Sequence, residues 1–463
     1  MKKYIAILLA LVMVLSLAAC GNSNSGTTPP AEKPAEAPKA DTPAEAPTGG
    51  ETPAEPTGGA SEITLWTYPI GNWGNEEVVN GLTAAFEAET GIKVNVEYLD
   101  YTNGDDKTNT AITSGETPDI IMEGPERLVA NYGVNGHMID LSDMLDDTDY
   151  AEINGAVMAA CTAPDGAVYQ YPLVMTAHCM AINVNAFEEA GALDYVDLDS
   201  HTWTTEQFFQ AVQALYDHYG DTVGAVYCSG QGGDQGTRAL VNNLYGGTFT
   251  TADHTAYTWD DPLNVKALEA LYAQDGIAYD ASIAGGDEIA LFYQGVLKMA
   301  FCWNIAQQLN PNQAGTGAEL TLNGDKIAVM AFPSEDGNAK LQGGIWGFGI
   351  FDNGDPARVE AAKQFIKYMC DSEHTAEAVK AANYFAVRDT AEGTDLSGIW
   401  ADNAVMNEYT KLMPYLGDYY QVTAGWAQAR TEWWNMLQKV GEGADVATVV
   451  AEYAANANAA AAG

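Results

Sequence analysis

The feature that most constrains the fold is an alternation of strand-like and helix-like segments that begins at Ile63. Residues 63–66 and 92–96 have the composition and alternation of strands, and residues 75–89 between them place their apolar side chains on one helical face. A second helical segment, residues 105–114, leads to the apolar run 119–122. Strand, helix, strand, helix, strand is typical of a parallel sheet covered by helices, so the sequence predicts an α/β fold.

A second series of alternating segments follows. Residues 181–185, 223–227, 298–303, 327–333 and 343–350 are strand-like. Thr204 and Gln207 have the spacing of a capping box and predict the start of a helix, and further helices are expected at 264–273, from Pro356, and near the C-terminus. The roughly 400 residues from Ser61 onward exceed what one hydrophobic core usually holds, so we expect two domains.

The N-terminus has the pattern of an export signal. Lys2 and Lys3 precede an uncharged apolar segment, residues 4–19, which is shorter than the ~20 residues that cross a bilayer as a helix. The segment ends in Leu-Ala-Ala-Cys at Cys20, which resembles the bacterial lipobox, whose cysteine is acylated and becomes the mature N-terminus. We predict a lipoprotein signal peptide at 1–19 and a lipid on Cys20 that anchors the chain at the extracellular face of the cell membrane; the alternative is an ordinary signal peptide.

Residues 20–60 form a spacer of biased composition. The sequence PAEAP occurs at 34–38 and again at 43–47, and PAEP follows at 53–56. Such a segment has little apolar surface to bury, and its prolines favour extended polyproline II conformations. We therefore predict a disordered linker between the lipid and the folded part.

The charge of the chain excludes some partners. The sequence holds 63 acidic and 20 basic residues, which gives a formal net charge of -43. Nucleic acid binding requires cationic groups that displace counterions, so no nucleic acid partner is expected. An acidic cluster at 140–149 lacks the ligand order and glycine of a calcium-binding EF-hand, and we interpret it as solvated surface.

Motifs for catalysis are absent from the sequence. It contains no HExxH, GxSxG, zinc-ligand or phosphate-loop spacing, and its six histidines are dispersed. We therefore expect no enzyme activity, no cofactor and no metal. After Cys20 the five remaining cysteines lack CxxC spacing, which favours buried thiols over a disulfide framework.

Several short sequence patterns occur in an order that is typical of one protein family. They are the first strand at 63–66, Thr-Pro-Asp-Ile at 117–120, Tyr-Pro at 171–172, Trp-Thr at 203–204, the stretch 295–303 and Gly-Gly at 343–344. From Ser61 to about Val450 the chain resembles the extracellular solute-binding proteins that include maltose-binding and other sugar-binding components of ABC importers. Residues 385–388 depart from this pattern, because a Leu-Pro or Ile-Pro pair is expected there.

The resemblance implies a two-lobed periplasmic-binding-protein fold of type II, with two mixed or parallel sheets, covering helices and a hinge. We place the first lobe at 61–174 plus 331–372 and the second at 178–328 plus 375–463. The resemblance also implies a monomer that closes around a solute and delivers it to an ABC permease in the membrane.

A sugar site combines flat aromatic rings with polar groups, because a sugar presents both C–H faces and hydroxyls. Aromatic and polar residues near the predicted strand ends are therefore candidates, although any of them could instead be a packed core residue or a solvated acid. The candidates are Trp66, Tyr68, Glu123, Trp303, Asn304 and Trp346, followed by Tyr171, His178, Gln231, Trp259, Tyr384 and Arg388.

These observations together predict a lipid-anchored protein without enzyme activity that captures a carbohydrate, specifically an oligosaccharide. Two alternatives stay open. The same fold could bind a polyamine or another small solute, which would suit the acidic composition. A surface-tethered glycan hydrolase would need a pair of facing carboxylates, and the 63 acidic residues could supply one without any motif.

Overall fold

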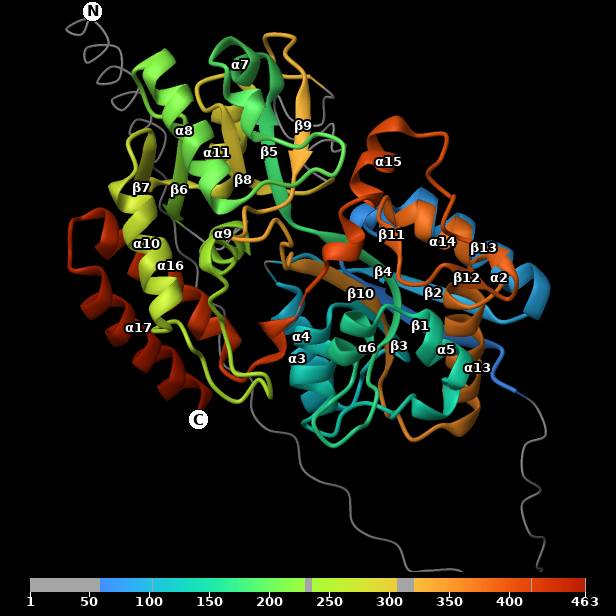
Figure 1. Ribbon diagram of the computed structural model, residues 1–463. Helices are drawn as coiled ribbons and strands as arrows, with labels where there is room; N and C mark the ends of the chain where they lie inside the picture. The colour runs from blue at the N-terminus through green and yellow to red at the C-terminus, as the bar shows by residue number, and fades with distance from the viewer. Residues whose placement is uncertain (1–58, 102, 230–234, 306–319, 418, 463) are drawn as a thin grey trace, which may run out of the picture. The chain divides into compact units, whose positions relative to one another are not determined.

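Six strands from distant parts of the chain form the larger sheet (Figure 1). The structure is a computed structural model that describes residues 59–462 except 102, 230–234, 306–319 and 418. In spatial order the strands are β11 (Phe385–Ala386), β4 (Tyr171–Ala177), β10 (Gly343–Ile350), β3 (Ile120–Glu123), β1 (Glu62–Thr67) and β2 (Lys93–Tyr98). β1 is parallel to β2 and β3, whereas β10 is antiparallel to β3 and β4, so the sheet is mixed.

Local sequence signals explain the first half of this sheet. The helix α2 (Glu76–Thr90) begins where the Asn75 side chain accepts the Glu77 N–H at 3.0 Å, and it ends at Gly91 with φ 74°. A left-handed glycine at this position closes a helix without a steric penalty. The helix α3 (Gly104–Ser114) connects β2 to β3. The predicted order of strand, helix, strand, helix, strand is therefore confirmed.

Three helices pack together over this sheet: α2, α13 (Pro356–Cys370) and α14 (Thr375–Ala382). Phe86 of α2 meets Phe365 of α13 edge to face at 5.2 Å, and Phe365 in turn meets Phe348 of β10 at 5.7 Å. All three rings are fully buried. These contacts form the core that holds the ends of β1 and β3 in place.

The second group of strands forms two small sheets. One has the order β8 (Met299–Trp303), β5 (Cys179–Asn183), β9 (Ile327–Met330), with both pairings antiparallel. The other pairs β6 (Gly224–Ser229) with β7 (Ile277–Ala284) in parallel. The helices associated with this group are α7 (Val184–Glu189), α8 (Thr205–Tyr219), α9 (Gln235–Tyr245), α10 (Pro262–Ala273), α11 (Gly285–Tyr293), α16 (Trp426–Gly441) and α17 (Val446–Ala461).

The capping box predicted for α8 is confirmed. Gln207 N–H donates to the Thr204 hydroxyl at 3.2 Å, and Thr204 N–H donates to the Gln207 side chain at 2.7 Å. The α8 ring of Phe208 packs edge to face on Trp203 at 5.3 Å. This helix therefore starts where the local sequence predicted, and its apolar face joins the core of the second group.

The chain passes between the two groups of strands near His178. Only this residue separates β4 from β5, and its N–H donates to the carbonyl of Gln342 at 2.7 Å. Gln342 immediately precedes β10, so two crossings are joined by one backbone hydrogen bond. We expected residues 331–342 in the first lobe, but Ala331 N–H bonds the carbonyl of His201 and Lys340 N–H bonds the Asn243 side chain at 2.6 Å. This segment thus packs with the second group.

A second correction concerns residues 375–386, which we expected in the second lobe. β11 pairs with Met175 and Val174 of β4, and the Trp73 indole donates to the carbonyl of Ala378 in α14 at 3.2 Å. The chain joins the second group only at α15 (Ala404–Thr410), where the Tyr409 hydroxyl accepts from Trp303. Strand partners far away in the sequence decide these boundaries, and local patterns do not report them.

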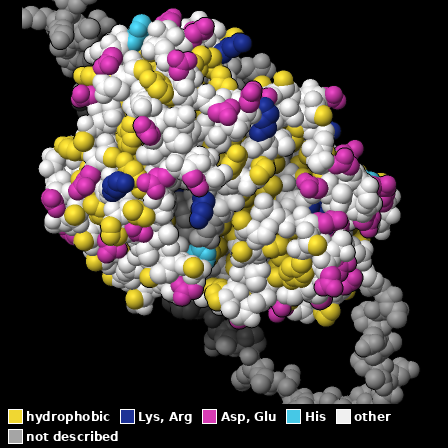
Figure 2. All heavy atoms as spheres, viewed as in Figure 1, with side chains coloured by type: hydrophobic (Ala, Val, Ile, Leu, Met, Phe, Trp, Pro, Cys, Tyr) yellow, Lys and Arg dark blue, Asp and Glu magenta, His cyan; other side chains and the backbone are white. Residues whose placement is uncertain are grey.

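Two further features match simple expectations. Cys161, Cys179, Cys228, Cys302 and Cys370 are all buried and form no disulfide, as predicted. None of the helices in the described ranges is both long enough and apolar enough to cross a membrane. On the face shown in Figure 2, Asp and Glu side chains are more widespread than Lys and Arg, in line with the acidic composition.

Candidate functional site

The carboxyl ends of β1 and β3 bring polar and aromatic side chains together. Tyr68 directly follows β1, and Glu123 is the last residue of β3. The short helix α4 (Pro125–Arg127) begins two residues later and carries Arg127. We call this site the Glu123 cluster; its members are Tyr68, Tyr101, Asp105, Glu123, Glu126, Arg127, Trp346, Tyr384 and Tyr419.

Arg127 holds the charged part of the cluster together. Its guanidinium bonds Glu123 Oε1 at 2.7 Å and the two oxygens of Asp105 at 2.6 and 3.1 Å. The Tyr68 hydroxyl donates to the same Asp105 carboxylate at 2.9 Å, and the guanidinium lies 5.1 Å from the centre of the Tyr68 ring. With Glu126 included, three carboxylates share one guanidinium, so the cluster has an excess of acidic groups.

The Glu123 carboxyl is buried but only half satisfied. The residue is 1% exposed, and its Oε2 atom has no hydrogen-bond partner among the described residues. Burial raises the pKa of Glu123 to about 8, against the opposing charge of Arg127. A buried polar oxygen without a partner costs about 1–3 kcal/mol, which makes Oε2 a position for a ligand group.

Two stacked aromatic pairs belong to the cluster. Tyr68 and Tyr101 stack with centroids 5.1 Å apart, and Trp346 and Tyr384 stack at 4.7 Å with an interplanar angle of 17°. Burial and the charge of Glu123 raise the pKa of Tyr384 to about 12, and the same two causes raise the pKa of Tyr101 well above its usual value. Both pairs therefore lie near Glu123.

The pairs also present surface to solvent. Tyr101 is 52% exposed. Trp346 is half-buried. The cluster thus combines exposed aromatic faces with a hydrogen-bonding oxygen that has no partner.

A residue from the C-terminal part completes the cluster. The Tyr419 hydroxyl donates to Glu126 Oε2 at 2.7 Å, across nearly 300 residues of sequence. Its segment is fixed by Leu341, whose N–H and carbonyl bond Tyr415 and Gly417, both at 2.8 Å. Residues of three remote segments therefore meet at the ends of β1 and β3.

Comparison with known proteins identifies the family. Residues 81–408 match the model of the bacterial extracellular solute-binding proteins, which is well over half of the chain. The chain belongs to this family. No curated protein matches the chain in sequence.

Solved structures agree with the family. The solute-binding protein is similar to the cyclic α-maltosyl-1,6-maltose binding protein from Arthrobacter globiformis, with a TM-score of 0.71 and 19% identity over 87% of this chain and 99% of that chain. It is also similar to a sugar-binding protein from Xanthomonas citri, with a TM-score of 0.67 and 16% identity over 87% and 97%.

A third similar structure is an ABC substrate-binding protein from Listeria monocytogenes in complex with cycloalternan, with a TM-score of 0.62 and 18% identity over 86% of this chain and 98% of that chain. At such identities the likeness shows the fold. The predicted two-lobed α/β binding-protein fold is confirmed.

Four of the predicted site residues lie in the Glu123 cluster: Tyr68, Glu123, Trp346 and Tyr384. Trp66 lies on β1 and is half-buried, with the ammonium of Lys107 4.8 Å from its ring centre. Lys107 in turn pairs with Glu97 of the neighbouring strand β2.

Two predicted tryptophans of this solute-binding protein lie instead in the interior of the second group. Trp303 is fully buried, donates to the Tyr409 hydroxyl at 2.7 Å and packs on Phe292. Trp259 is fully buried between Phe249 and Trp433, at 5.1 and 5.4 Å. Neither ring has surface for a solute, because neighbouring aromatic side chains enclose both faces.

Three further predicted site residues are Asn304, His178 and Gln231. Asn304 directly follows β8 and is 9% exposed. His178 is half-buried and lies at the crossing between β4 and β5, where its backbone bonds Gln342. Gln231 lies outside the described residues.

Tyr171 and Arg388 belong to an internal network of hydrogen bonds and ion pairs that lies outside the Glu123 cluster. Arg388 pairs with Asp149 at 2.8 Å and Asp371 at 3.0 Å, and it donates to the Tyr171 hydroxyl at 3.2 Å. Lys367 bonds the same hydroxyl at 3.1 Å and Asp371 at 2.8 Å. Both predicted residues thus bond other protein groups, and Arg388 also lines a separate cavity.

Five members of the cluster were not among the candidates: Tyr101, Asp105, Glu126, Arg127 and Tyr419. Three of them could have been found. Glu126 and Arg127 closely follow Glu123, which was a predicted candidate at the end of the third strand, and Tyr101 follows the second strand. Tyr419 carries no local signal, because only tertiary structure brings it to Glu126.

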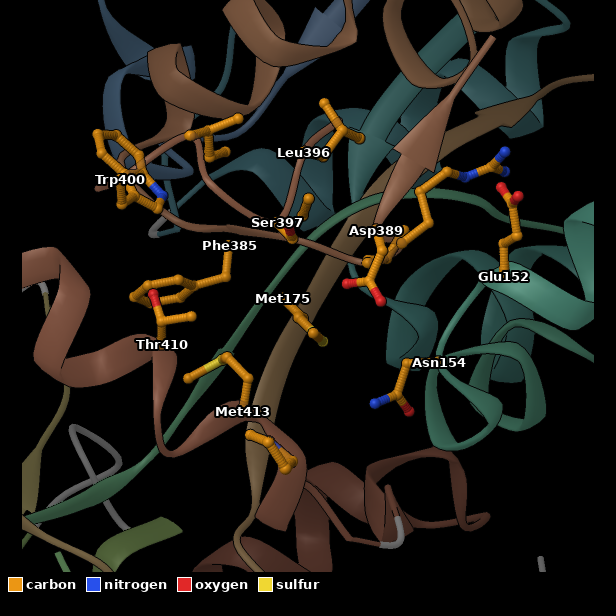
Figure 3. Close-up of a pocket in the computed structure, with 15 residues that line it drawn as sticks. Glu152, Asn154, Met175, Phe385, Asp389, Leu396, Ser397, Trp400, Thr410 and Met413 are labelled. Atoms are coloured by element: carbon orange, nitrogen blue, oxygen red, sulfur yellow. The ribbon is translucent and has the colours of Figure 1, made fainter. Parts of the chain in front are cut away.

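A separate cavity of about 290 Å³ lies beside β4 and β11. Figure 3 shows Phe385, Trp400 and Met413 on one side of it and Asp389, Glu152 and Asn154 on the other. None of its lining residues belongs to the Glu123 cluster. The cavity is therefore a separate site from the Glu123 cluster.

Proposed function

We propose that this solute-binding protein captures a carbohydrate at the Glu123 cluster. The observation that carries the proposal is the unpartnered Oε2 of the buried Glu123, held near two stacked aromatic pairs. A ligand hydroxyl would supply the missing hydrogen bond. The exposed faces of Tyr101 and Trp346 would pack on the C–H faces of sugar rings.

A hydroxyl fits this position better than most groups because it both donates and accepts. Burial raises the pKa of Glu123 to about 8, so the carboxyl changes its protonation state near neutral pH. An ionised Oε2 needs a donor, and a protonated Oε2 needs an acceptor. A hydroxyl serves either state, whereas an ammonium group serves only the ionised one.

The named ligands of similar proteins support an oligosaccharide. One such protein binds cyclic α-maltosyl-1,6-maltose, and another holds cycloalternan. Their identities to this chain are only 19% and 18%, so the particular sugar is a separate question for binding experiments.

The delivery step is also part of the proposal. The protein would close about the crossings near His178 and Gln342, deliver the sugar unaltered to an ABC permease, and stay at the cell membrane through a lipid on Cys20. A solute can shift the equilibrium to a closed form only if it binds that form more tightly. Cys20 lies outside the described residues, so its acylation stays a sequence-based prediction.

A binding screen tests the proposal. Purified protein is heated with single sugars, oligosaccharides, polyamines and metal salts, and hits are measured by isothermal titration calorimetry. A ligand at 100 times its Kd raises the free energy of unfolding by about 2.7 kcal/mol, so true ligands give clear shifts. We expect an oligosaccharide to bind with 1:1 stoichiometry; a panel in which no carbohydrate binds would overturn the proposal.

A polyamine is the second candidate. The excess of three carboxylates over one guanidinium in the cluster favours a cation, and cations also pack on aromatic rings. Binding of spermidine without any sugar would select this candidate. Chromatography of the sugar after long incubation tests the hydrolase alternative, for which new products would appear.

A further inference from the structure

We propose that a second cavity, at the end of α9, binds a further sugar unit of the same oligosaccharide. This inference rests on the proposed function, since it assigns an additional contact site to the same ligand. The cavity has a volume of about 580 Å³, within the range of roughly 300–1,000 Å³ typical of ligand pockets. Its lining residues are Asn242, Asn243, Gly246, Gly247, Thr248, Phe249, Thr250, Ala252, Ser334, Glu335, Asp336, Asn338, Lys340 and Gln342.

Specific backbone geometry builds one wall of this cavity. Gly246 adopts φ 76°, a left-handed conformation that favours glycine, and the chain then turns away from α9. A side chain at Gly247 would collide with the Asn264 amide oxygen, so the loop approaches α10 as closely as only glycine allows. The Asn264 amide donates to the carbonyl of Thr248 at 2.6 Å and fixes the loop.

One asparagine clamps the opposite wall. The Asn243 amide donates to the carbonyl of Lys340 at 3.0 Å, and its oxygen accepts the N–H of Lys340 at 2.6 Å. This pair of bonds has the geometry of a strand ladder and holds the segment 334–342 against α9. The cavity is therefore enclosed by fixed elements on both sides.

Two amide oxygens in this cavity lack hydrogen-bond partners. Gln342 is 5% exposed, and its Oε1 bonds no described group. Asn242 is half-buried, and its Oδ1 is likewise unpartnered. Most buried side-chain oxygens in proteins have a hydrogen-bond partner, so two lining residues with unpartnered oxygens favour a ligand that donates hydrogen bonds.

The chemistry of the lining indicates a sugar rather than an anion or a purely apolar molecule. Neutral amides and hydroxyls dominate the walls, and they match ligand hydroxyl groups. Phe249 adds an aromatic side chain to the lining. The charged lining residues are Glu335, Asp336 and Lys340, whose net negative charge disfavours an anionic ligand.

One segment of the chain connects this cavity to the Glu123 cluster. Leu341, between the lining residues Lys340 and Gln342, bonds Tyr415 and Gly417. Two residues after Gly417, Tyr419 donates to Glu126 of the cluster. A ligand chain that follows this segment would contact both sites.

The experiment compares sugars of different length. Affinities of the intact folded protein for the series from maltose to maltohexaose are measured by calorimetry for the wild type and for Gln342→Met and Asn242→Ala. Each substitution removes one unpartnered oxygen. The control is Asn338→Ala, because Asn338 lines the same cavity but is exposed. Thermal unfolding of each variant without sugar verifies that it folds.

We expect the wild type to bind longer chains more tightly than maltose. Each of the two variants should weaken binding of the longer chains roughly 3- to 10-fold, the loss typical of one hydrogen bond. Asn242→Ala should leave maltose unchanged, and Gln342→Met, which lies at the proposed hinge, should weaken the longer chains more than maltose. Asn338→Ala should bind all lengths like the wild type. If one variant fails to fold, the other still decides the result.

Three other outcomes overturn the inference. If both variants match the wild type at every length, the cavity does not contact the sugar. If they weaken all lengths equally, the substitutions affect lobe closure instead. If the wild type binds the series but no better at greater length, the second site is absent; if no carbohydrate of any kind binds, the proposed function itself fails.

Discussion

The Arg388 network and the Glu123 cluster have similar compositions but differ in the balance between acidic and basic groups. Both regions contain carboxylates, an arginine and at least one tyrosine. Both also contain residues that the sequence had suggested as ligand-binding candidates. In the network, two carboxylates, Asp149 and Asp371, meet two cations, Lys367 and Arg388. In the cluster, three carboxylates meet the single cation Arg127.

The pKa shifts of the buried carboxyl groups reflect this difference in charge balance. Burial alone would raise the pKa of Asp149, but the N–H of Asp146 and the charge of Arg388 lower it. In the cluster, burial prevails and raises the pKa of Glu123 to about 8. The network also contains a buried atom without a partner among the described residues, Arg388 Nε, so such an atom does not by itself distinguish the two regions. The excess of carboxylates and the exposed ring of Tyr101 distinguish the cluster. A balanced network stabilises the fold.

The largest expected effect is on the network. Arg388→Met removes the closer of the two cationic partners of Asp149, a carboxylate that is 4% exposed, and leaves Lys367 at 3.5 Å. We expect a loss of about 3 kcal/mol in the free energy of unfolding, measured by urea denaturation, because a buried carboxylate loses its nearest counter-charge. The control Lys363→Met breaks the more exposed pair with Asp143 and should cost less than about 1 kcal/mol. Equal losses of stability in the two variants would contradict the expected difference between a buried and an exposed ion pair.

The second effect concerns the cluster and is seen in binding rather than stability. Glu123→Leu removes the unpartnered oxygen, and sugar affinity should fall by about 1.5–3 kcal/mol, or roughly 10- to 150-fold, in calorimetry. Arg127 keeps its two bonds to Asp105, so stability should stay equal or rise. Glu123→Gln retains an acceptor and should retain part of the affinity. Full affinity in the leucine variant would show that Glu123 does not touch the sugar.

A smaller effect is expected at the exposed ring. Tyr101→Ala removes an aromatic face and should weaken sugar binding by about 0.5–1.5 kcal/mol, because the ring packs on the sugar. Stability should change by less than about 1 kcal/mol, since the side chain is 52% exposed. Tyr101→Phe keeps the face and serves as the control. Fluorescence titration measures both variants, and weaker binding of the phenylalanine variant would assign the role to the hydroxyl instead.

The smallest expected effect is the pH dependence of folding stability. Its sign is opposite for Glu123 and for Asp149. The folded pKa of Glu123 is raised, so its contribution to stability is full at low pH and is lost as pH rises from about 4.5 to about 8. The folded pKa of Asp149 is lowered, so its contribution is present at neutral pH and is lost on acidification.

Urea unfolding between pH 5.5 and 8.5 tests this sign. Glu288, another buried carboxyl with a pKa raised to about 8 mainly by burial, acts in the same direction and provides a common background. The wild type should lose stability with rising pH faster than Glu123→Leu, by at most about 1.4 kcal/mol per pH unit. Parallel curves would mean that Glu123 is already ionised at pH 5.5.

The sequence by itself predicted the elements whose signals are local. The strands at β1, β2 and β3 and the capping box of Thr204 are confirmed because each depends on residues a few positions apart. Glu123 was found for the same reason, since the end of a parallel strand marks a ligand edge of the sheet. The order of these local signals also indicated the family.

Only the tertiary structure decided which aromatic and charged residues are satisfied internally. Trp303 and Trp346 are both tryptophans next to strand-like sequence, yet one is enclosed by Phe292 and Tyr409 and the other keeps exposed surface. Tyr419 reaches Glu126 across nearly 300 residues, and Arg388 pairs with Asp149 and with Asp371, which are more than 200 residues apart in the sequence. Burial and hydrogen-bond completion depend on long-range partners, and a one-dimensional pattern does not contain them.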